Sequence, residues 1–147
     1  MYSSEQFDEQ KTRVMKYIVF KRRTEQEVRT KFKNSIEENM LEDIIEYLKE
    51  AKYLDDKEYV EKAINNFKTL KNLSLKELKY KLLAKGLNKD DIEDYIYDHK
   101  EEMQQYELQS AKNIFYKKKK DMESEEIKQY LLKKGYSLEN ANEALQD

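Results

Sequence analysis

The sequence predicts an all-α fold, arranged as an elongated tandem array of three three-helix repeats. Proline is absent and glycine occurs only twice, although sheet folds need such residues at their turns. Charged residues form 41% of the chain and hydrophobic residues 38%. A thin array, in which each repeat packs mainly against its neighbours, needs less core per residue than one globule and fits this composition.

A regular spacing of short motifs supports the array. A glutamate followed by an apolar residue recurs 50 and then 49 residues later, at Glu27–Val28, Glu77–Leu78 and Glu126–Ile127. Four positions after the apolar member of each pair comes a further apolar residue: Phe32, Leu82 and Leu131. A near-constant period of this size indicates tandem helical repeats. The expected units are residues 1–54, which include an N-terminal lead, residues 55–104 and residues 105–147.

The first repeat is predicted to contain a long, a short and a third helix. Polar residues 1–8 are expected to fray, and the long helix runs from about Glu9 to Lys21, with an inner face of Val14, Tyr17 and Ile18. Thr24 and Glu27 form a capping box that opens the short helix, because each side chain can bond the other residue's backbone N–H. Ser35 and Glu38 have the same spacing and are expected to open the third helix, whose apolar face is Leu41, Ile44, Ile45 and Leu48.

The second repeat follows the same order. It begins with a helix from about Asp56 to Leu70, and a capping box at Ser74 and Glu77 opens its short helix. Gly86 is placed to end that helix in the left-handed conformation, which only Gly enters without steric cost. Asn88 is expected to cap the third helix, whose inner face is Ile92, Tyr95, Ile96 and His99.

The third repeat is expected to start near Tyr106. Leu108, Ala111 and Phe115 repeat the spacing of an earlier stripe, Val60, Ala63 and Phe67. Gly135 is the second predicted left-handed helix end, and Ser137 is the predicted cap of a last helix. The inner face of that last helix is Leu138, Ala141 and Leu145.

The stretch from Tyr47 to Val60 is expected to join the first two repeats. It closes one apolar helix and opens the next, and Asp55 and Asp56 are placed to cap the new helix. Carboxylates there accept backbone N–H bonds at the positive end of the helix dipole. The predicted structural residues of this joint are Leu48, Tyr53, Leu54, Asp55, Asp56 and Tyr59. We expect Leu48, Tyr53 and Leu54 to be buried between the two repeats.

Net charge alternates along the chain. Residues 11–33 carry 9 Lys and Arg against 2 Asp and Glu, or +7, and residues 34–58 carry 3 against 9, or −6. The segments 62–85, 89–107, 112–134 and 138–147 then carry +6, −6, +4 and −3. The total of −2 hides this alternation. In a stacked array it favours a basic stripe along one side, which suits an extended polyanion or a repeating protein surface better than a small ligand.

The candidate residues for binding a filament or DNA are cations of the basic helices. They are Lys21, Arg22, Arg23, Arg29, Lys68, Lys71, Lys79, Lys117, Lys118, Lys119 and Lys120. The run from Lys117 to Lys120 ends a helix of the third repeat, and the run from Lys21 to Arg23 stands at the corresponding place in the first. The alternative is that these cations form solvated helix faces, favoured at C-terminal ends by the helix dipole.

The sequence offers little for catalysis or metal binding. It has no Cys and one His, His99, which excludes disulfides and thiolate sites and argues against a histidine site. The acidic pairs Glu37–Glu38, Asp55–Asp56 and Asp90–Asp91 stand at helix N-termini, where capping explains them, and no Gly-rich phosphate loop is present. We therefore expect no enzymatic activity, no metal and no cofactor. The lack of Cys and of a membrane-spanning apolar run favours a cytoplasmic protein.

Four stretches carry a resemblance to a known family. They are LKEAKYLDDKEYV, KRRTEQEVRTKF, SLKELKYKLLAKGLNKDDIEDYI and EEIKQYLLKKGY. Together they resemble the RecX family, small bacterial regulators of the RecA recombinase, over about residues 11–147. The first stretch matches the family's pattern at the six joint residues given above, and it departs from that pattern at Lys52, where the family usually has Gly.

The resemblance implies a non-enzymatic protein made of three tandem three-helix repeats, which we expect to be a monomer. Members of the family bind the RecA–DNA filament and inhibit the recombinase, ATPase and coprotease activities of RecA, which implies a role in DNA repair and the SOS response. The implied partners are the RecA filament and the single-stranded DNA within it, contacted along the filament groove or at a filament end. Two alternatives stay open: direct nucleic-acid binding by helix-turn-helix-like units, and a scaffold for an unrelated protein.

Overall fold

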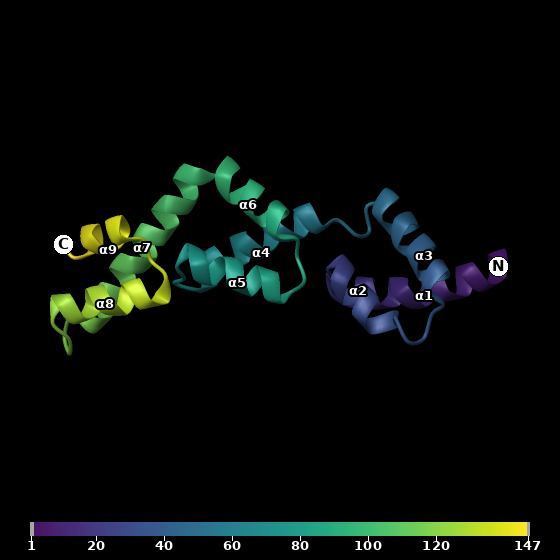
Figure 1. Cartoon of the computed structure of the whole chain (residues 1–147), viewed down its shortest axis with the longest axis horizontal. Helices are drawn as coiled ribbons and strands as arrows, with labels where there is room; N and C mark the ends of the chain where they lie inside the picture. Colours follow the sequence, from purple (N-terminus) through teal and green to yellow (C-terminus); the bar gives the residue numbers. More distant parts are fainter. Residues whose placement is uncertain (1, 147) are drawn as a thin grey trace.

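The chain is a string of helices laid along one long axis. Residues 2–146 are described in a computed structural model, and over this range they form helices and no strand. The helices are α1 (Ser4–Phe20), α2 (Glu25–Phe32), α3 (Glu38–Glu50), α4 (Asp56–Leu70), α5 (Leu75–Ala84), α6 (Lys89–Asp98), α7 (Lys100–Lys118), α8 (Ser124–Lys134) and α9 (Leu138–Ala144). The two termini lie at opposite ends of the array (Figure 1). The predicted fold class, an elongated all-α array, is confirmed.

Three separate hydrophobic clusters take the place of a single core. The first joins α1, α2 and α3, and its fully buried members include Val14, Val28, Ile44 and Leu48. The second joins α4, α5 and α6, and it includes Ile64, Leu78, Leu82 and Ile92. The third joins α7, α8 and α9, and it includes Ala111, Ile127, Leu131 and Ala141. Each cluster gathers the apolar stripes of three consecutive helices, so each repeat buries its own core.

Helix α7 contributes to two of these cores. Met103, near its start, is fully buried in the second cluster, whereas Ala111 and Phe115 belong to the third. The residue between α6 and α7 is His99, whose ring stacks on Tyr95 at a centroid distance of 3.9 Å. The unit boundary expected between residues 104 and 105 falls inside this long helix. The second and third repeats are therefore connected by continuous packing.

Most predicted helix caps are present, but two N-terminal expectations are wrong. Thr24 and Ser74 form the expected capping boxes with Glu27 and Glu77. Ser35 does not cap α3; the Glu37 carboxylate does, because it accepts the N–H groups of Asn39 and Met40 at 3.1 and 3.0 Å. Residues 4–8 are not frayed either, because Ser3 and Gln6 form a capping box that opens α1.

Three apolar positions also differ from expectation. Tyr53 is 52% exposed instead of buried, because the chain turns outward there to leave α3. Leu138 is 56% exposed, since α9 begins at this residue and only its later residues reach the third core. On α7, Leu108 was expected on the inner face but is only half-buried. The neighbouring Glu107 is the buried residue, at 3% exposed. The apolar pattern of the sequence did not indicate that a carboxylate would be buried here.

The predicted first joint is divided between two cores. Leu48 and Leu54 are buried in the first cluster, and Tyr59 is buried in the second. Leu48 is therefore buried within the first repeat and not between the repeats, whereas Leu54 also lines a cavity at the joint with Asn88 and Asp91 of the second repeat. Asp55 caps α4 by accepting the N–H of Glu58 at 3.1 Å, as predicted. Asp56 instead reaches across to the first repeat.

Candidate functional site

Adjacent repeats are joined by the N-cap of one short helix and the end of the next. Thr24 accepts the N–H of Glu27 and donates its hydroxyl hydrogen to the Lys85 carbonyl at 2.8 Å. Ser74 does the same one repeat later, accepting from Glu77 and donating to the Lys134 carbonyl at 2.7 Å. Both hydroxyl residues are fully buried. One hydroxyl group thus caps its own helix and also holds the neighbouring repeat.

A glycine makes each of these close approaches possible. Gly86 has a φ of +84°, and a Cβ there would come 2.5 Å from the Cβ of Gln26. Gly135 has a φ of +99°, and a Cβ there would come 2.7 Å from the Cβ of Lys76. Any side chain would therefore collide with the preceding repeat. The two glycines were predicted as left-handed helix ends, which is confirmed, but their role between repeats was not.

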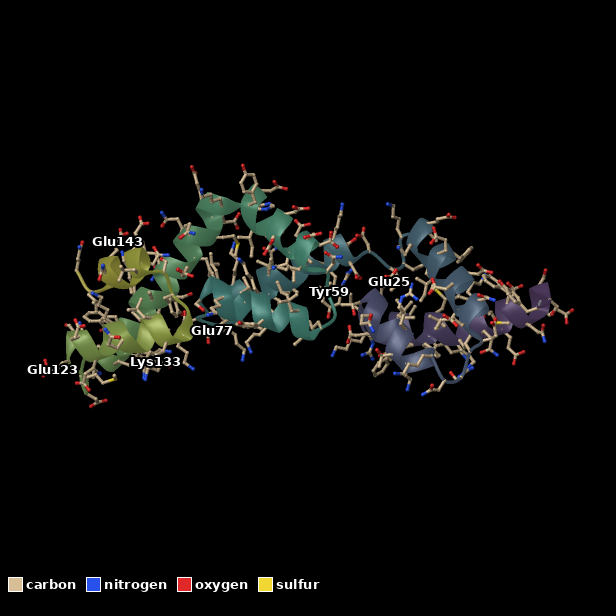
Figure 2. All side chains as sticks on the ribbon, in the orientation of Figure 1. Glu25, Tyr59, Glu77, Glu123, Lys133 and Glu143 are labelled. Carbon is tan, nitrogen blue, oxygen red and sulfur yellow. The ribbon has the colours of Figure 1, made fainter. Side chains whose placement is uncertain are left out.

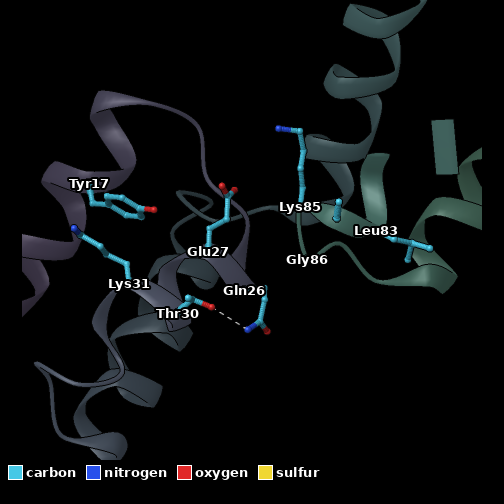
Figure 3. A pocket seen from close by; sticks show the side chains of 9 residues that line it. Tyr17, Gln26, Glu27, Thr30, Lys31, Leu83, Lys85 and Gly86 are labelled. Carbon is cyan, nitrogen blue, oxygen red and sulfur yellow. Dashed lines mark hydrogen bonds between the residues drawn. The ribbon is translucent and has the colours of Figure 1, made fainter. Parts of the chain in front are cut away.

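A shallow groove opens beside the first of these contacts. It has a volume of about 440 Å³ and is lined by Tyr17, Gln26, Glu27, Thr30, Lys31, Leu83, Ala84, Lys85 and Gly86. Figure 3 shows Tyr17 and Lys31 on the side of the first repeat, with Leu83 and Lys85 on the side of the second. The Tyr17 ring has the Arg23 guanidinium 4.0 Å from its centroid and the Lys31 ammonium at 5.8 Å. The groove thus combines an aromatic face with several cations.

The cations of this groove recur at the second joint. Lys81 lies 50 residues after Lys31 in the equivalent short helix, and Lys134 lies 49 residues after Lys85 at the equivalent helix end. Lys134 and Lys118 also approach the ring of Tyr130, at 5.6 and 4.2 Å. Figure 2 shows Glu25 and Tyr59 near the first joint, and Glu77 and Lys133 near the second. Each joint therefore carries a lysine from both repeats that it connects.

Three of the predicted binding cations are held by acidic partners. Arg22 pairs with Glu58 across the first joint at 3.1 Å. Arg29 pairs with Glu42, which raises the pKa of the guanidinium and lowers the pKa of the carboxyl. Lys68 pairs with Glu102 and lowers the pKa of that carboxyl by hydrogen bonding. These cations are less available to an outside anion, because an approaching phosphate must compete with a carboxylate already in place.

The other predicted cations have no acidic partner within the described residues. They are Lys21, Arg23, Lys71, Lys79, Lys117, Lys118, Lys119 and Lys120. Among these, Lys119 lies 4.7 Å from the ring of the exposed Tyr116. Lys71 ends α4 beside the second joint, where its carbonyl accepts the Tyr106 hydroxyl at 2.8 Å.

Sequence reasoning missed the lysines that the joints bring together. Lys31, Lys81, Lys85 and Lys134 were not among the candidate residues, although their spacings of 50 and 49 equal those of the glutamate motifs. That shared period was the available signal. Lys31 and Lys85 are 54 positions apart in the chain and line the same groove. Only the packing of one repeat on the next brings them together.

Other kinds of site find no support among residues 2–146. No group of three or more His, Cys, Asp or Glu side chains is arranged to hold a metal ion within this range. No helix in the described part of the chain is long and apolar enough to cross a membrane. The lysines at the joints between repeats, with the groove beside the first joint, are thus the surface feature with the clearest chemistry.

Two known proteins with related sequences carry the same name. The regulatory protein RecX of Staphylococcus carnosus is 31% identical over 137 residues, which cover 90% of this chain and 51% of the relative. The regulatory protein RecX of Streptococcus mutans is 30% identical over 147 residues, covering 97% of this chain and 56% of the relative. The chain thus spans about half the length of these relatives. No family model matches it.

Solved structures agree with the sequence relatives. The crystal structure of RecX from Lactobacillus salivarius superposes with a TM-score of 0.83 at 22% identity, covering 98% of this chain and 97% of that one. A second crystal structure, of a regulatory protein RecX, superposes with a TM-score of 0.82 at 19% identity, covering 97% of this chain and 74% of that one. These structures establish the fold, and the sequence relatives establish the kinship. The chain belongs to the RecX family.

Proposed function

We propose that this protein regulates RecA by binding RecA–DNA filaments through the lysines at its two inter-repeat joints. The observation that carries the proposal is the recurrence of Lys31 with Lys85 and of Lys81 with Lys134 at equivalent places, without acidic partners in the described structure. A repeated pair of cations suits a repeated anion, such as the phosphates of a nucleoprotein filament. The relatives' name, regulatory protein RecX, supports RecA as the target.

The action is that of a binding protein. The groove at the first joint is shallow and open, as suits contact with a large partner. Binding along the filament inhibits the recombinase, ATPase and coprotease activities of RecA, and so modulates DNA repair and the SOS response. The location that follows from such a partner is the cytoplasm, and one copy of the chain suffices for the contact.

The test is RecA ATP hydrolysis on single-stranded DNA, measured with and without this protein across a salt series. Lys31→Glu with Lys85→Glu should abolish most of the inhibition, and Lys81→Glu with Lys134→Glu should do the same at the second joint. The matched control is Lys62→Glu with Lys89→Glu, which has the same charge change at lysines paired with Glu58 and Glu93. Loss of each phosphate contact should make the salt dependence shallower, lowering the magnitude of the slope of log affinity against log salt concentration by about 1. If the control variant loses inhibition as fully as the variants at the joints, the change in net charge alone explains the loss of inhibition. The joints are then not the binding face.

Two further measurements separate the modes of binding. Inhibition that scales with filament mass supports binding along the groove of the filament, whereas inhibition that scales with the number of ends supports end capping. Fluorescence anisotropy with a labelled single-stranded oligonucleotide, without RecA, tests direct nucleic-acid binding. Cations beside Tyr17 and Tyr130 favour that second function, since aromatic rings beside cations are platforms for unpaired bases.

A further inference from the structure

The two joints of the array are closed by different polar groups. At the second joint the buried Glu107 carboxylate accepts the N–H of Leu75 at 2.8 Å, the N–H of Ser137 at 3.0 Å and the side-chain amide of Asn140 at 2.9 Å. The bonded groups come from α5 of the second repeat and from the N-terminal end of α9, whereas Glu107 itself lies on α7. One carboxylate therefore fixes three segments at once.

Further bonds reinforce the second joint. The Tyr106 hydroxyl donates to the Lys71 carbonyl at 2.8 Å and accepts the N–H of Leu73 at 3.0 Å. Asn113 donates to Asn72 at 2.9 Å. Since α7 also packs in both neighbouring cores, the second and third repeats form one body.

The first joint has fewer such contacts. Beyond the Thr24 bond, Asp56 accepts the N–H of Glu25 at 3.1 Å, and Arg22 pairs with Glu58 at the surface. No helix contributes to both clusters across this joint, since the first cluster ends at Leu54 and the second begins at Tyr59. Its connecting segment, residues 51–55, contains no helix.

A matched pair of residues explains part of the difference. Asn140 is the third residue after the N-cap of α9, and Asp91 is the third residue after the N-cap of α6. Asn140 donates a hydrogen bond to the carboxylate of its joint. Asp91 has no hydrogen to donate when ionised, and it faces Asp56 across a cavity of about 420 Å³ that Glu25, Lys49, Lys52, Leu54, Asp55, Lys57 and Asn88 also line.

The electrostatics of Asp56 agree with this geometry. Burial is the main reason that its pKa is raised, and the neighbouring carboxylates of Glu25 and Asp91 raise it further. The N–H bond from Glu25 and the ammonium of Lys49 oppose the shift without cancelling it. The ionised carboxylates therefore repel one another when the first joint closes.

We propose that the first repeat pivots at this joint on a rigid body formed by the second and third repeats, and that the Asp56–Asp91 pair keeps the pivot loose. Replacing Asp91 by an amide would give the first joint the donor that Asn140 provides at the second. A consequence, which rests on the proposed function, is that pivoting changes the distance between Lys31 and Lys85. Lys81 and Lys134 at the second joint keep a fixed separation, so the first joint adapts to the filament and the second joint sets the register of binding.

Pairs of spin labels test the pivot directly. The chain has no native Cys, so cysteines can be placed at its exposed positions without background labelling. Glu46→Cys with Asp94→Cys spans the first joint, and Asp94→Cys with Glu143→Cys spans the second. Pulsed electron–electron double resonance should give a broad distribution of label-to-label distances across the first joint and a narrow distribution across the second.

Two reciprocal substitutions complete the test. Asp91→Asn should narrow the first distribution to the width seen across the second, and Asn140→Asp should broaden the second. Equal widths in the parent protein, or a first distribution that Asp91→Asn leaves unchanged, would overturn the proposal. Helicity is followed by circular dichroism, and if Asn140→Asp unfolds the third repeat, the Asp91→Asn result alone decides. These measurements need no RecA, so their outcome is independent of the ATP hydrolysis test.

Discussion

The first and second joints use one hydroxyl contact but differ in how they treat a carboxylate. Thr24 and Ser74 make equivalent bonds to the following repeat. Glu107 is almost fully buried and saturated with donors, whereas Asp56 is half-buried and stands among other acids. A buried carboxylate is tolerated where several N–H groups take the place of water, and it weakens a contact where like charges surround it. The repeated unit sets where the joints form, and the surrounding polar residues set how firmly they hold.

The largest expected difference between the joints comes from removing the two carboxylates. Glu107→Ala should destabilise the protein by about 3–5 kcal/mol, because three donors lose their acceptor and each unsatisfied buried donor costs about 1–3 kcal/mol. Asp56→Ala should cost only about 1–2 kcal/mol, since one half-buried N–H loses its partner. Urea unfolding followed by circular dichroism measures both. Equal losses would show that the two joints are equally firm.

Removing the shared hydroxyl contact should affect the two joints alike. Ser74→Ala and Thr24→Ala should each cost about 2 kcal/mol, at the upper end for an N-cap, because each hydroxyl also holds the neighbouring repeat. Ser35→Ala is the control, with an expected change within about 0.5 kcal/mol, since Glu37 caps that helix instead. Thermal unfolding of the three variants checks the ranking. A loss of stability in Ser35→Ala as large as that in Thr24→Ala would show that Ser35 caps α3 after all.

The segment connecting the first two repeats contains a smaller, stabilising opportunity. Lys52 has a φ of +67°, a conformation that disfavours residues with a side chain. Lys52→Gly should therefore stabilise the protein by about 0.5–1 kcal/mol, after the extra flexibility of Gly in the unfolded chain is subtracted. Lys52→Ala, which keeps the Cβ, should not. If the urea midpoint of unfolding rises equally in Lys52→Gly and Lys52→Ala, the stabilisation comes from loss of the lysine charge and not from relief of backbone strain.

The smallest expected effect is a dependence on pH at the first joint. The pKa of Asp56 is raised in the folded protein, so the folded state binds its proton more tightly than the unfolded chain does. This contribution to stability is fully present below the unfolded pKa of about 3.9. It is lost as the pH rises through the folded pKa. Asp56→Asn keeps an oxygen acceptor for Glu25 but removes the titration.

Unfolding of the parent and of Asp56→Asn, measured between pH 3 and pH 7, checks this sign. The variant should gain on the parent as the pH rises, and the gain should level off above the folded pKa of Asp56. A gain that instead grows as the pH falls would mean that Asp56 is stabilised as a carboxylate, as in an ordinary salt bridge.

Much of the fold followed from local patterns in the sequence. The period of the glutamate motifs, the capping boxes at Thr24 and Ser74 and the two glycines correctly located the short helices and their ends. These features depend on residues within one or two helical turns, so local propensity and backbone geometry are sufficient to predict them. Ser35 was expected to open the third helix because its spacing to Glu38 is that of a capping box. The Glu37 carboxylate, one of the acidic pair assigned to capping, accepts two N–H groups there instead.

The candidate site could be predicted only in part. The alternation of charge directed attention to the basic helices, but it could not separate Arg29, which is paired with Glu42, from Lys31 two positions later, which lines a groove. Helical periodicity gives the face of a residue and not the partner that another helix brings to it. Whether these cations bind a filament stays a prediction.

The sequence by itself determined the helices, their order and the three apolar stripes, because each arises from spacing within a short segment. Only the tertiary structure decided which polar groups meet between repeats. Glu107 lies 32 positions from Leu75, 30 from Ser137 and 33 from Asn140. Whether a carboxylate is saturated or repelled depends on the groups that packing places around it, and no local pattern encodes that placement.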